Sequence, residues 1–230
     1  MVWPNALLHL LQLASPSLPV GAYSYSEGLE TLVHDGHITT AADLADWLRQ
    51  ELRHGPFGLE LTVMVQAHAA MVEGDMGAIA RHNHWLSALR DTEEIREQQW
   101  QMGRTLTKLL HQLEPDLAEV LATVGLPCNF AIAFSIAAAH WQIAPDAMAL
   151  GYGHGWLTNL VNAGIKLIPL GQTTGQMLLV QLYPELEDRV ARAIAFAPIT
   201  DSREPISICN WGMALASMNH ETLYSRLFRS

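Results

Sequence analysis

Eleven histidines make metal coordination the first chemistry to consider for this chain. His220-Glu221 begins like a zinc-binding helix motif, but Tyr224 stands where the second histidine ligand would be needed. His82 and His84 are two residues apart, so on one helix their side chains point to different sides. Neither spacing makes a metal cage, so we expect no tightly bound metal or other cofactor, and histidines that are solvated or that cap helices.

Two further stretches resemble parts of enzyme motifs. Residues 25–28, Tyr-Ser-Glu-Gly, are half of a nucleophile elbow, but Ser24 replaces its first glycine and no predicted strand leads into it. Residues 151–155 imitate a glycine-rich phosphate loop, yet they lack the lysine and the hydroxyl residue that nucleotide chemistry needs. We therefore expect no catalytic residues and no enzyme activity.

Composition limits the class of partner. The chain has 230 residues, half of them hydrophobic, which excludes intrinsic disorder. Its 13 Lys and Arg against 23 Asp and Glu give a net charge of −10, which argues against nucleic acid and anionic membranes as partners. Cys128 and Cys209 lie among apolar residues, and no signal peptide is evident, so we expect a reduced, cytoplasmic protein.

A long stretch with few charges must form the core. Between Val120 and Pro184 the only charged residues are Asp146 and Lys166. Polar residues interrupt the run of about 20 apolar residues that a membrane span would need. The remaining interpretation is a set of helices buried on nearly all sides. A monomer of this size would hide them incompletely, so we expect a homodimer.

Helical periodicity dominates the elements that position these residues. Ser24–Glu27, Thr40–Asp43 and Asp91–Glu94 resemble capping boxes at helix starts, and strand-like alternation is nearly absent. We predict an all-α protein, a single-domain bundle of about nine or ten helices over residues 1–230. The loop at about 198–205 separates a C-terminal segment, 206–230.

Three stretches rich in Gly, Pro, Ser and Gln are more specific than ordinary loops: 15–30 (SPSLPVGAYSYSEGLE), 166–176 (KLIPLGQTTGQ) and 220–230 (HETLYSRLFRS). In this order, they resemble the signatures of the UreF family of urease accessory proteins. A fourth stretch, 94–103 (EIREQQWQMG), resembles the family's central charged helix. Lys166 and Thr174 depart from it, since the family often has Arg and Asp there.

The resemblance implies an all-helical dimeric adaptor that is not an enzyme. It implies that the adaptor bridges UreD/UreH and the GTPase UreG in the complex that delivers nickel to apo-urease, and that this complex handles the metal only transiently. The alternative is a regulator that activates GTP hydrolysis by UreG and couples it to nickel transfer.

The C-terminal segment is the predicted UreD/UreH contact. Its large apolar residues follow a helical stripe that a partner groove could bury, with two arginines free to pair. The alternative is a frayed helix docked on its own domain. The predicted contact residues are Leu223, Tyr224, Arg226, Leu227, Phe228 and Arg229.

A composite surface is predicted to bind UreG. The phenols of Tyr23 and Tyr25 could receive Arg226, while Glu30 and Lys166 could place charge near the nucleotide. In the alternative, the turn before Tyr23 merely connects two helices, and Glu30 and Lys166 are structural. The residues expected to shape these loops are Pro16, Pro19, Gly21, Gly28, Pro169, Gly171, Gln172, Gly175 and Gln176.

Overall fold

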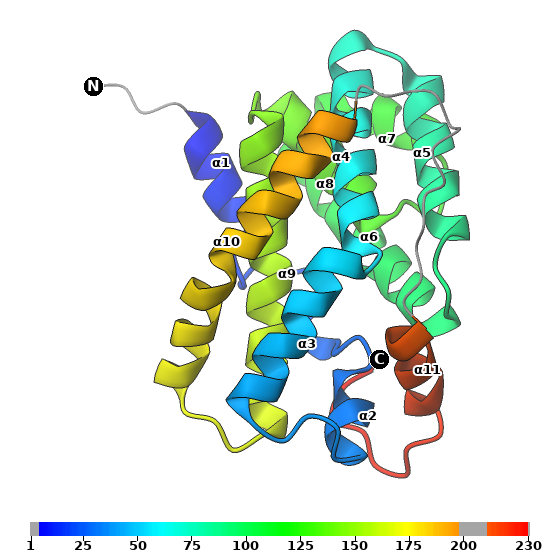
Figure 1. Cartoon of the computed structure of the whole chain (residues 1–230). Helices are drawn as coiled ribbons and strands as arrows, with labels where there is room; N and C mark the ends of the chain where they lie inside the picture. Colours follow the sequence, from blue (N-terminus) through cyan, green and yellow to red (C-terminus); the bar gives the residue numbers. More distant parts are fainter. Residues whose placement is uncertain (1–4, 198–210, 230) are drawn as a thin grey trace.

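The computed structural model describes residues 5–197 and 211–229, and within these ranges every regular element is helical (Figure 1). The α-helices are α1 (Asn5–Leu13), α2 (Leu29–His34), α3 (Ala41–His54), α4 (Phe57–Glu73), α5 (Met76–Ala88), α6 (Glu93–Leu113), α7 (Ala118–Val124), α8 (Phe130–His140), α9 (Pro145–Leu167), α10 (Gln172–Phe196) and α11 (Trp211–His220). Two short 3₁₀ helices are η1 (Ala22–Ser24) and η2 (Pro115–Leu117).

The all-α prediction is confirmed, but the number of helices is not nine or ten. The described residues form eleven α-helices. Helices α2 and α7 have only 6 and 7 residues, fewer than two turns, so hydrophobic periodicity cannot identify them. The start of helix α8 was not among the predicted capping boxes; there the Asn129 side chain accepts the backbone N–H of Ala131.

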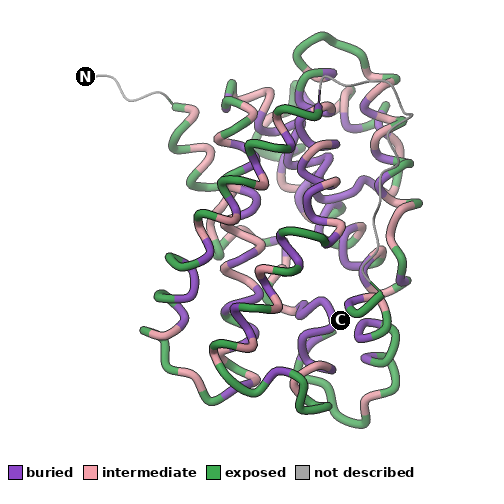
Figure 2. The backbone as a smooth tube through the Cα atoms, viewed as in Figure 1, coloured by how far each residue is buried: buried purple, intermediate pink, exposed green. Residues whose placement is uncertain are grey.

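Helix α8 is the centre of the core. All nine residues from Phe130 to Ala138 are buried, which explains why the long stretch with few charges shows no polar face. Helices α4 and α6 pack against it, and α10 runs along α9, α3 and α4. Figure 2 shows the buried backbone concentrated in this inner layer, with exposed residues on the outer faces.

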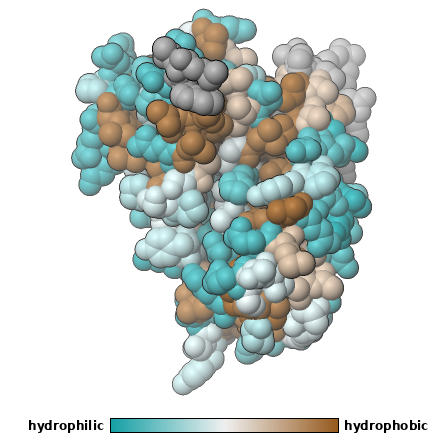
Figure 3. All heavy atoms as spheres, turned by 90° about the vertical axis from the view of Figure 1, so that its left-hand side faces the viewer, coloured by the Kyte–Doolittle hydropathy of each residue, from teal (hydrophilic) through white to brown (hydrophobic). Residues whose placement is uncertain are grey.

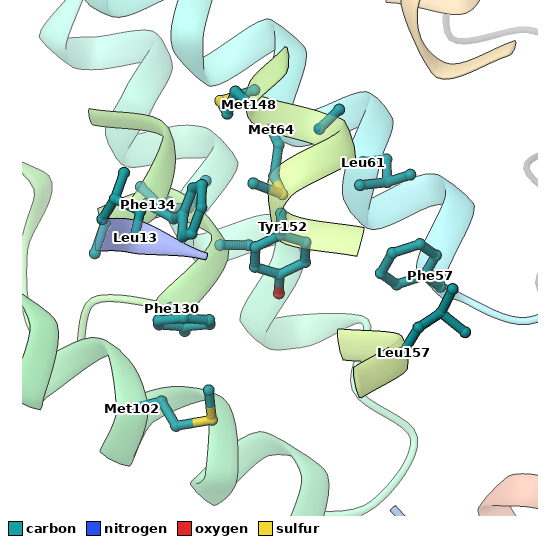
Figure 4. Close-up of a cluster of buried hydrophobic side chains, with 14 of the residues drawn as sticks. Leu13, Phe57, Leu61, Met64, Met102, Phe130, Phe134, Met148, Tyr152 and Leu157 are labelled. Carbon is teal, nitrogen blue, oxygen red and sulfur yellow. The ribbon is translucent and has the colours of Figure 1, made fainter. Parts of the chain in front are cut away.

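Aromatic rings fill the core between these helices. The Tyr152 ring on α9 lies edge-on to Phe134, with ring centroids 5.3 Å apart, and is tilted against Phe130 at 5.7 Å. Phe57 of α4 stacks on Trp156 at 4.4 Å. Figure 4 shows the Tyr152 ring at the centre of this cluster, which ties α4, α8 and α9 together.

The three predicted capping boxes have different outcomes. Thr40 and Asp43 form the reciprocal box at the start of α3. At α6 the cap is Thr92, one residue later than Asp91, and its hydroxyl accepts from Ile95 N–H at 3.3 Å. Ser24–Glu27 is not a capping box, because α2 begins after Gly28 and the Glu27 side chain is used elsewhere.

One side of the bundle is partly apolar. Helix α1 exposes Leu7, Leu8 and Leu11, and α10 exposes Met177 and Val180. Figure 3 looks onto this side and shows hydrophobic side chains gathered mainly in its upper half. None of the helices in the described ranges combines the length and the hydropathy required to cross a bilayer.

Candidate functional site

Three stretches that the sequence singled out, 15–30, 94–103 and 166–176, meet around one cavity. The cavity has a volume of about 240 Å³ and lies between the turn before α2 and helices α6, α8 and α9. Its lining includes Pro16, Tyr23, Gln99, Lys166 and Gln172 from those stretches. This volume exceeds that of several water molecules.

The floor of the cavity is polar although it is buried. Glu27 accepts hydrogen bonds from Gln98 Nε2 at 2.8 Å and from Trp156 Nε1 at 2.9 Å, which ties the turn to α6 and α9. Burial raises the pKa of the Glu27 carboxyl, against the opposing effect of these two bonds. Glu27 also has a positive φ of 54°, which is uncommon for a residue with a side chain.

A second buried network lies beside Glu27. Arg90 Nη2 is 2.7 Å from Glu60 Oε2, and the Tyr152 hydroxyl donates to Glu60 Oε1. Burial raises the pKa of Tyr152 well above its ordinary value, with the Glu60 charge adding to the effect. Burial opposes the charge of Arg90, but Glu60 and Tyr152 outweigh it and raise the pKa of Arg90. The ion pair ties the segment after α5 to α4 inside the core.

The Glu30 carboxylate holds the C-terminal segment on the domain. It accepts the backbone N–H of Leu227 at 2.6 Å and that of Phe228 at 3.0 Å. Phe228 is buried in the core, and Arg229 N–H donates to the carbonyl of Ser24 at 2.8 Å. Residues 221–229, here called the tail, are thus docked on the turn before α2.

His220 connects the same carboxylate to α6. Its ring is fully buried, with Nε2 3.0 Å from Glu30 Oε2 and Nδ1 3.2 Å from Glu94 Oε2. Arg226 Nη1 lies 3.3 Å from Glu94 Oε1. Burial raises the pKa of Glu94, while its bond to His220 opposes the shift. Two carboxylates, one imidazole and one guanidinium form a closed network.

The tail is not the predicted helix. Helix α11 ends at His220, and residues 221–229 form turns and bends. A helix would require Leu227 N–H to donate to the carbonyl four residues earlier, but the Glu30 carboxylate takes that N–H instead. Docking also splits the predicted apolar stripe: Phe228 is buried, Leu223 is half-buried, and Tyr224 and Leu227 remain exposed.

The residues predicted for the composite surface differ in exposure and in the partners that they contact. Tyr23 is exposed, whereas Tyr25 is buried and its carbonyl accepts from Asn159 Nδ2 at 3.0 Å. The guanidinium of Arg226 pairs with Glu94 and not with a phenol, which corrects that expectation. Lys166 is exposed on α9, with Nζ 5.4 Å from the Phe228 ring centroid.

The predicted loop-shaping residues occupy turns around the cavity. Gly28 has a φ of 84°, and a Cβ there would lie 3.0 Å from Ser217 N on α11, so a side chain would be strained and crowded. A Cβ on Gly175 would overlap Ile165 of α9. Gly21 precedes η1 with a φ of 80°. The remaining members are exposed in turns or in the first turns of α10: Pro16, Pro19, Pro169, Gly171, Gln172 and Gln176.

Histidine placement differs from the expectation at two positions. His220 and His68 are buried, and His68 Nε2 lies 2.8 Å from the Ile143 carbonyl. Across residues 5–197 and 211–229, the structure brings no three His, Cys, Asp or Glu side chains close enough together to hold a metal ion. Cys128 is buried, and Cys209 lies outside the described residues.

The chain is similar to known proteins over its whole length. A family model described as UreF matches residues 38–183. The urease accessory protein UreF of Trichormus variabilis is 52% identical over 223 residues, which cover 97% of this chain and 95% of the relative. That of Microcystis aeruginosa is 51% identical over 232 residues and covers both chains fully. The UreF protein of Chromohalobacter salexigens is 38% identical over 229 residues, which cover 99% of this chain and 96% of the relative.

Proposed function

This chain belongs to the UreF family of urease accessory proteins, and we propose that it is a non-catalytic adaptor in urease maturation. In this proposal it bridges UreD/UreH and the GTPase UreG in the complex that delivers nickel to apo-urease. The chain itself holds nickel at most transiently.

The docked tail is the observation that carries the proposal. One network of hydrogen bonds fixes the tail through Glu30 and Glu94, yet the outer side chains of the tail remain uncovered. Tyr224 is fully exposed and Leu227 is 63% exposed. Helix α11 adds Trp211, Leu215 and Met218, which follow one helical face and are each more than half exposed.

Exposed aromatic and aliphatic side chains on a rigid support favour a protein partner. Such groups are costly to leave in water, and ordering them before binding reduces the entropy lost on association. The tail and α11 therefore form the proposed UreD/UreH surface. The cavity rim with Tyr23 and Lys166, on the other side of the docked Phe228, forms the proposed UreG surface.

Mixing experiments test this arrangement. In size-exclusion chromatography with light scattering, we expect this chain to form a complex with UreD and a larger one when UreG is added. We also expect UreG not to bind UreD when this chain is absent. A UreD–UreG complex of equal stability without this chain would contradict bridging.

Activation of UreG is the second candidate, supported by the exposed Lys166 ammonium at the cavity rim. A cation supplied in trans can stabilise the charge that develops during phosphoryl transfer. The Glu30 carboxylate is occupied by the tail, so Lys166 is the candidate that remains free to act. Activation predicts that GTP turnover rises by at least tenfold on mixing and that Lys166→Ala removes the rise.

A homodimer is also part of the proposal. The exposed leucines of α1 and the exposed Met177 and Val180 of α10 supply apolar surface that a second copy could cover. Light scattering of the chain alone tests this. We expect twice the mass of one chain, and we expect Leu8→Glu with Val180→Glu to give the mass of a single chain.

A further inference from the structure

The structure contains an arginine-rich groove that shares no residue with the proposed UreD/UreH and UreG surfaces. The groove lies where the end of α3 and the start of α4 face the middle of α10 (Figure 1). It has a volume of about 570 Å³. Its charged and titratable lining consists of Arg53, His54, Glu185, Asp188, Arg189 and Arg192.

Among the described residues, Arg189 has no carboxylate within ion-pair distance. Its Nε is buried without a hydrogen-bond partner, and within the described ranges no carboxylate forms an ion pair with it. Asp188 is 2.9 Å from Arg192 Nε, and Glu185 is shared by Arg49 and Arg53 at 2.9 and 3.5 Å. The acids in the groove are therefore already neutralised by other arginines.

The Arg189 guanidinium also lies at the positively charged end of helix α4. It lies flat against Gly58, the second residue of α4, where a Cβ would overlap it. The N-terminus of a helix carries partial positive charge, and Pro56 supplies no side-chain cap there. Of the acids near this end, Glu60 is paired with Arg90, and Glu51 is turned inward against Gly55.

A cation against the positive end of a helix is unfavourable unless an anion joins them. Burial and the neighbouring Arg192 lower the pKa of Arg189, and the Asp188 carboxylate opposes this shift only in part. The fork of a guanidinium matches the oxygens of a phosphate group. Arg53, Arg192 and His54 line the same groove, and its three arginines outnumber Glu185 and Asp188, so the net charge of the lining favours an anion.

We propose that this groove binds a phosphate group through Arg189, with Arg53, Arg192 and His54 around it. A free phosphate ion would occupy only part of the groove, so a small phosphate monoester fits the same chemistry. This proposal is independent of the adaptor role, because the groove and the tail use different residues.

Thermal unfolding of the full chain tests the proposal. Phosphate is added at constant ionic strength, with chloride as the reference salt. At about ten times the dissociation constant, we expect the midpoint to rise by about 3–6 °C. Arg189→Gln should abolish this rise. Its midpoint in chloride should equal or exceed that of the wild type, because an uncompensated cation has been removed.

Arg81→Gln is the matched control, since Arg81 is exposed on α5 and only loosely paired with Asp75 at 3.8 Å. It should respond to phosphate as the wild type does. The proposal is overturned if phosphate leaves the wild-type midpoint unchanged, if Arg189→Gln still responds, or if acetate stabilises as well as phosphate.

A measurement on the wild type avoids dependence on the variant. In side-chain NMR spectra, the Arg189 Nε–Hε signal should shift and saturate with inorganic phosphate. Glycerol 3-phosphate distinguishes the two sources: tighter saturation than with inorganic phosphate assigns the groove to a monoester, and equal or weaker saturation assigns it to the free ion. A shift that grows linearly without saturation for both would overturn the site.

Discussion

The Glu30 carboxylate and the His220 imidazole lie 3.0 Å apart although 190 residues separate them in the sequence. The same carboxylate accepts the N–H groups of Leu227 and Phe228, and the other ring nitrogen of His220 faces Glu94. Both ring nitrogens of His220 thus face a carboxylate oxygen, one from α2 and one from α6. One buried network therefore fastens α2, α6, α11 and the tail.

Glu30→Gln should release the tail. Glutamine keeps the shape but loses the charge, and its amide nitrogen cannot accept an N–H bond from the tail. We expect the free energy of unfolding to fall by about 3 kcal/mol, because a buried ionic network loses one partner. Hydrogen exchange at the Leu227 and Phe228 amides should accelerate strongly.

The control for this variant is Glu97→Gln. Glu97 is exposed on α6, 4.0 Å from Arg104, and a surface pair of this kind contributes less than about 1 kcal/mol. Tail amides should stay protected in Glu97→Gln. Unchanged protection in Glu30→Gln would show that the carboxylate does not hold the tail.

Glu27 should make stability decrease as pH rises. Burial raises the pKa of its carboxyl in the folded state above the ordinary value of 4.5. The folded protein then binds the proton more tightly than the unfolded chain does. Stability from this group is therefore complete below pH 4.5 and is lost as pH rises towards the folded pKa.

Chemical denaturation between pH 4 and pH 8 measures this effect. Glu27→Gln resembles the protonated carboxyl, so its stability should change less across this interval than that of the wild type. Glu73→Gln, an exposed change at the end of α4, should follow the wild type. Parallel curves for Glu27→Gln and the wild type would refute a raised pKa at Glu27.

The contact of α6 with α8 should tolerate no side chain at Gly103. A Cβ there would overlap the backbone carbonyl of Cys128, and backbone cannot move aside as a flexible side chain can. We expect Gly103→Ala to lower the free energy of unfolding by about 3 kcal/mol. Gly77→Ala, on exposed α5 with only side-chain ends 3.3 Å away, should be neutral or stabilising. Equal effects would contradict the tight crossing.

Cys128 should be chemically inert in the folded protein. Burial raises the pKa of its thiol to about 12, so little thiolate forms at pH 8. Iodoacetamide should leave Cys128 unmodified under native conditions and modify it after unfolding, as measured by peptide mass spectrometry. Rapid native labelling would mean that the α6–α8 layer opens readily.

One of the three predicted capping boxes formed as the local pattern predicts. Thr40 and Asp43 are three residues apart, and their capping box depends on nothing outside that turn. The network of Glu30, Glu94 and His220 joins residues 126 and 190 positions apart, which no spacing rule detects. One sequence signal does indicate that His220 is buried. It follows Met213, Ala216 and Ser217 by seven, four and three residues, so it continues the buried face of α11.

The conformation of the tail could not be predicted from local spacing. The spacing of Leu223 and Leu227 is that of a helix, and hydrophobic periodicity alone predicts one. The N–H groups of Leu227 and Phe228 instead bond to a carboxylate from a distant helix, and this tertiary contact overrides the local preference. The sequence predicted the tail residues as one group but not which of them face outward.

The most direct test of the adaptor account is light scattering on mixtures of UreD with the full chain carrying Tyr224→Ala and Leu227→Ala. Both side chains are exposed, so the fold and the Glu30 network should persist. The account predicts that the wild type and Val72→Ala, an exposed change at the far end of α4, bind UreD, whereas the double variant loses at least tenfold in affinity. Full binding by a correctly folded double variant would contradict the tail as the partner surface, and no binding by the wild type would contradict the adaptor role itself.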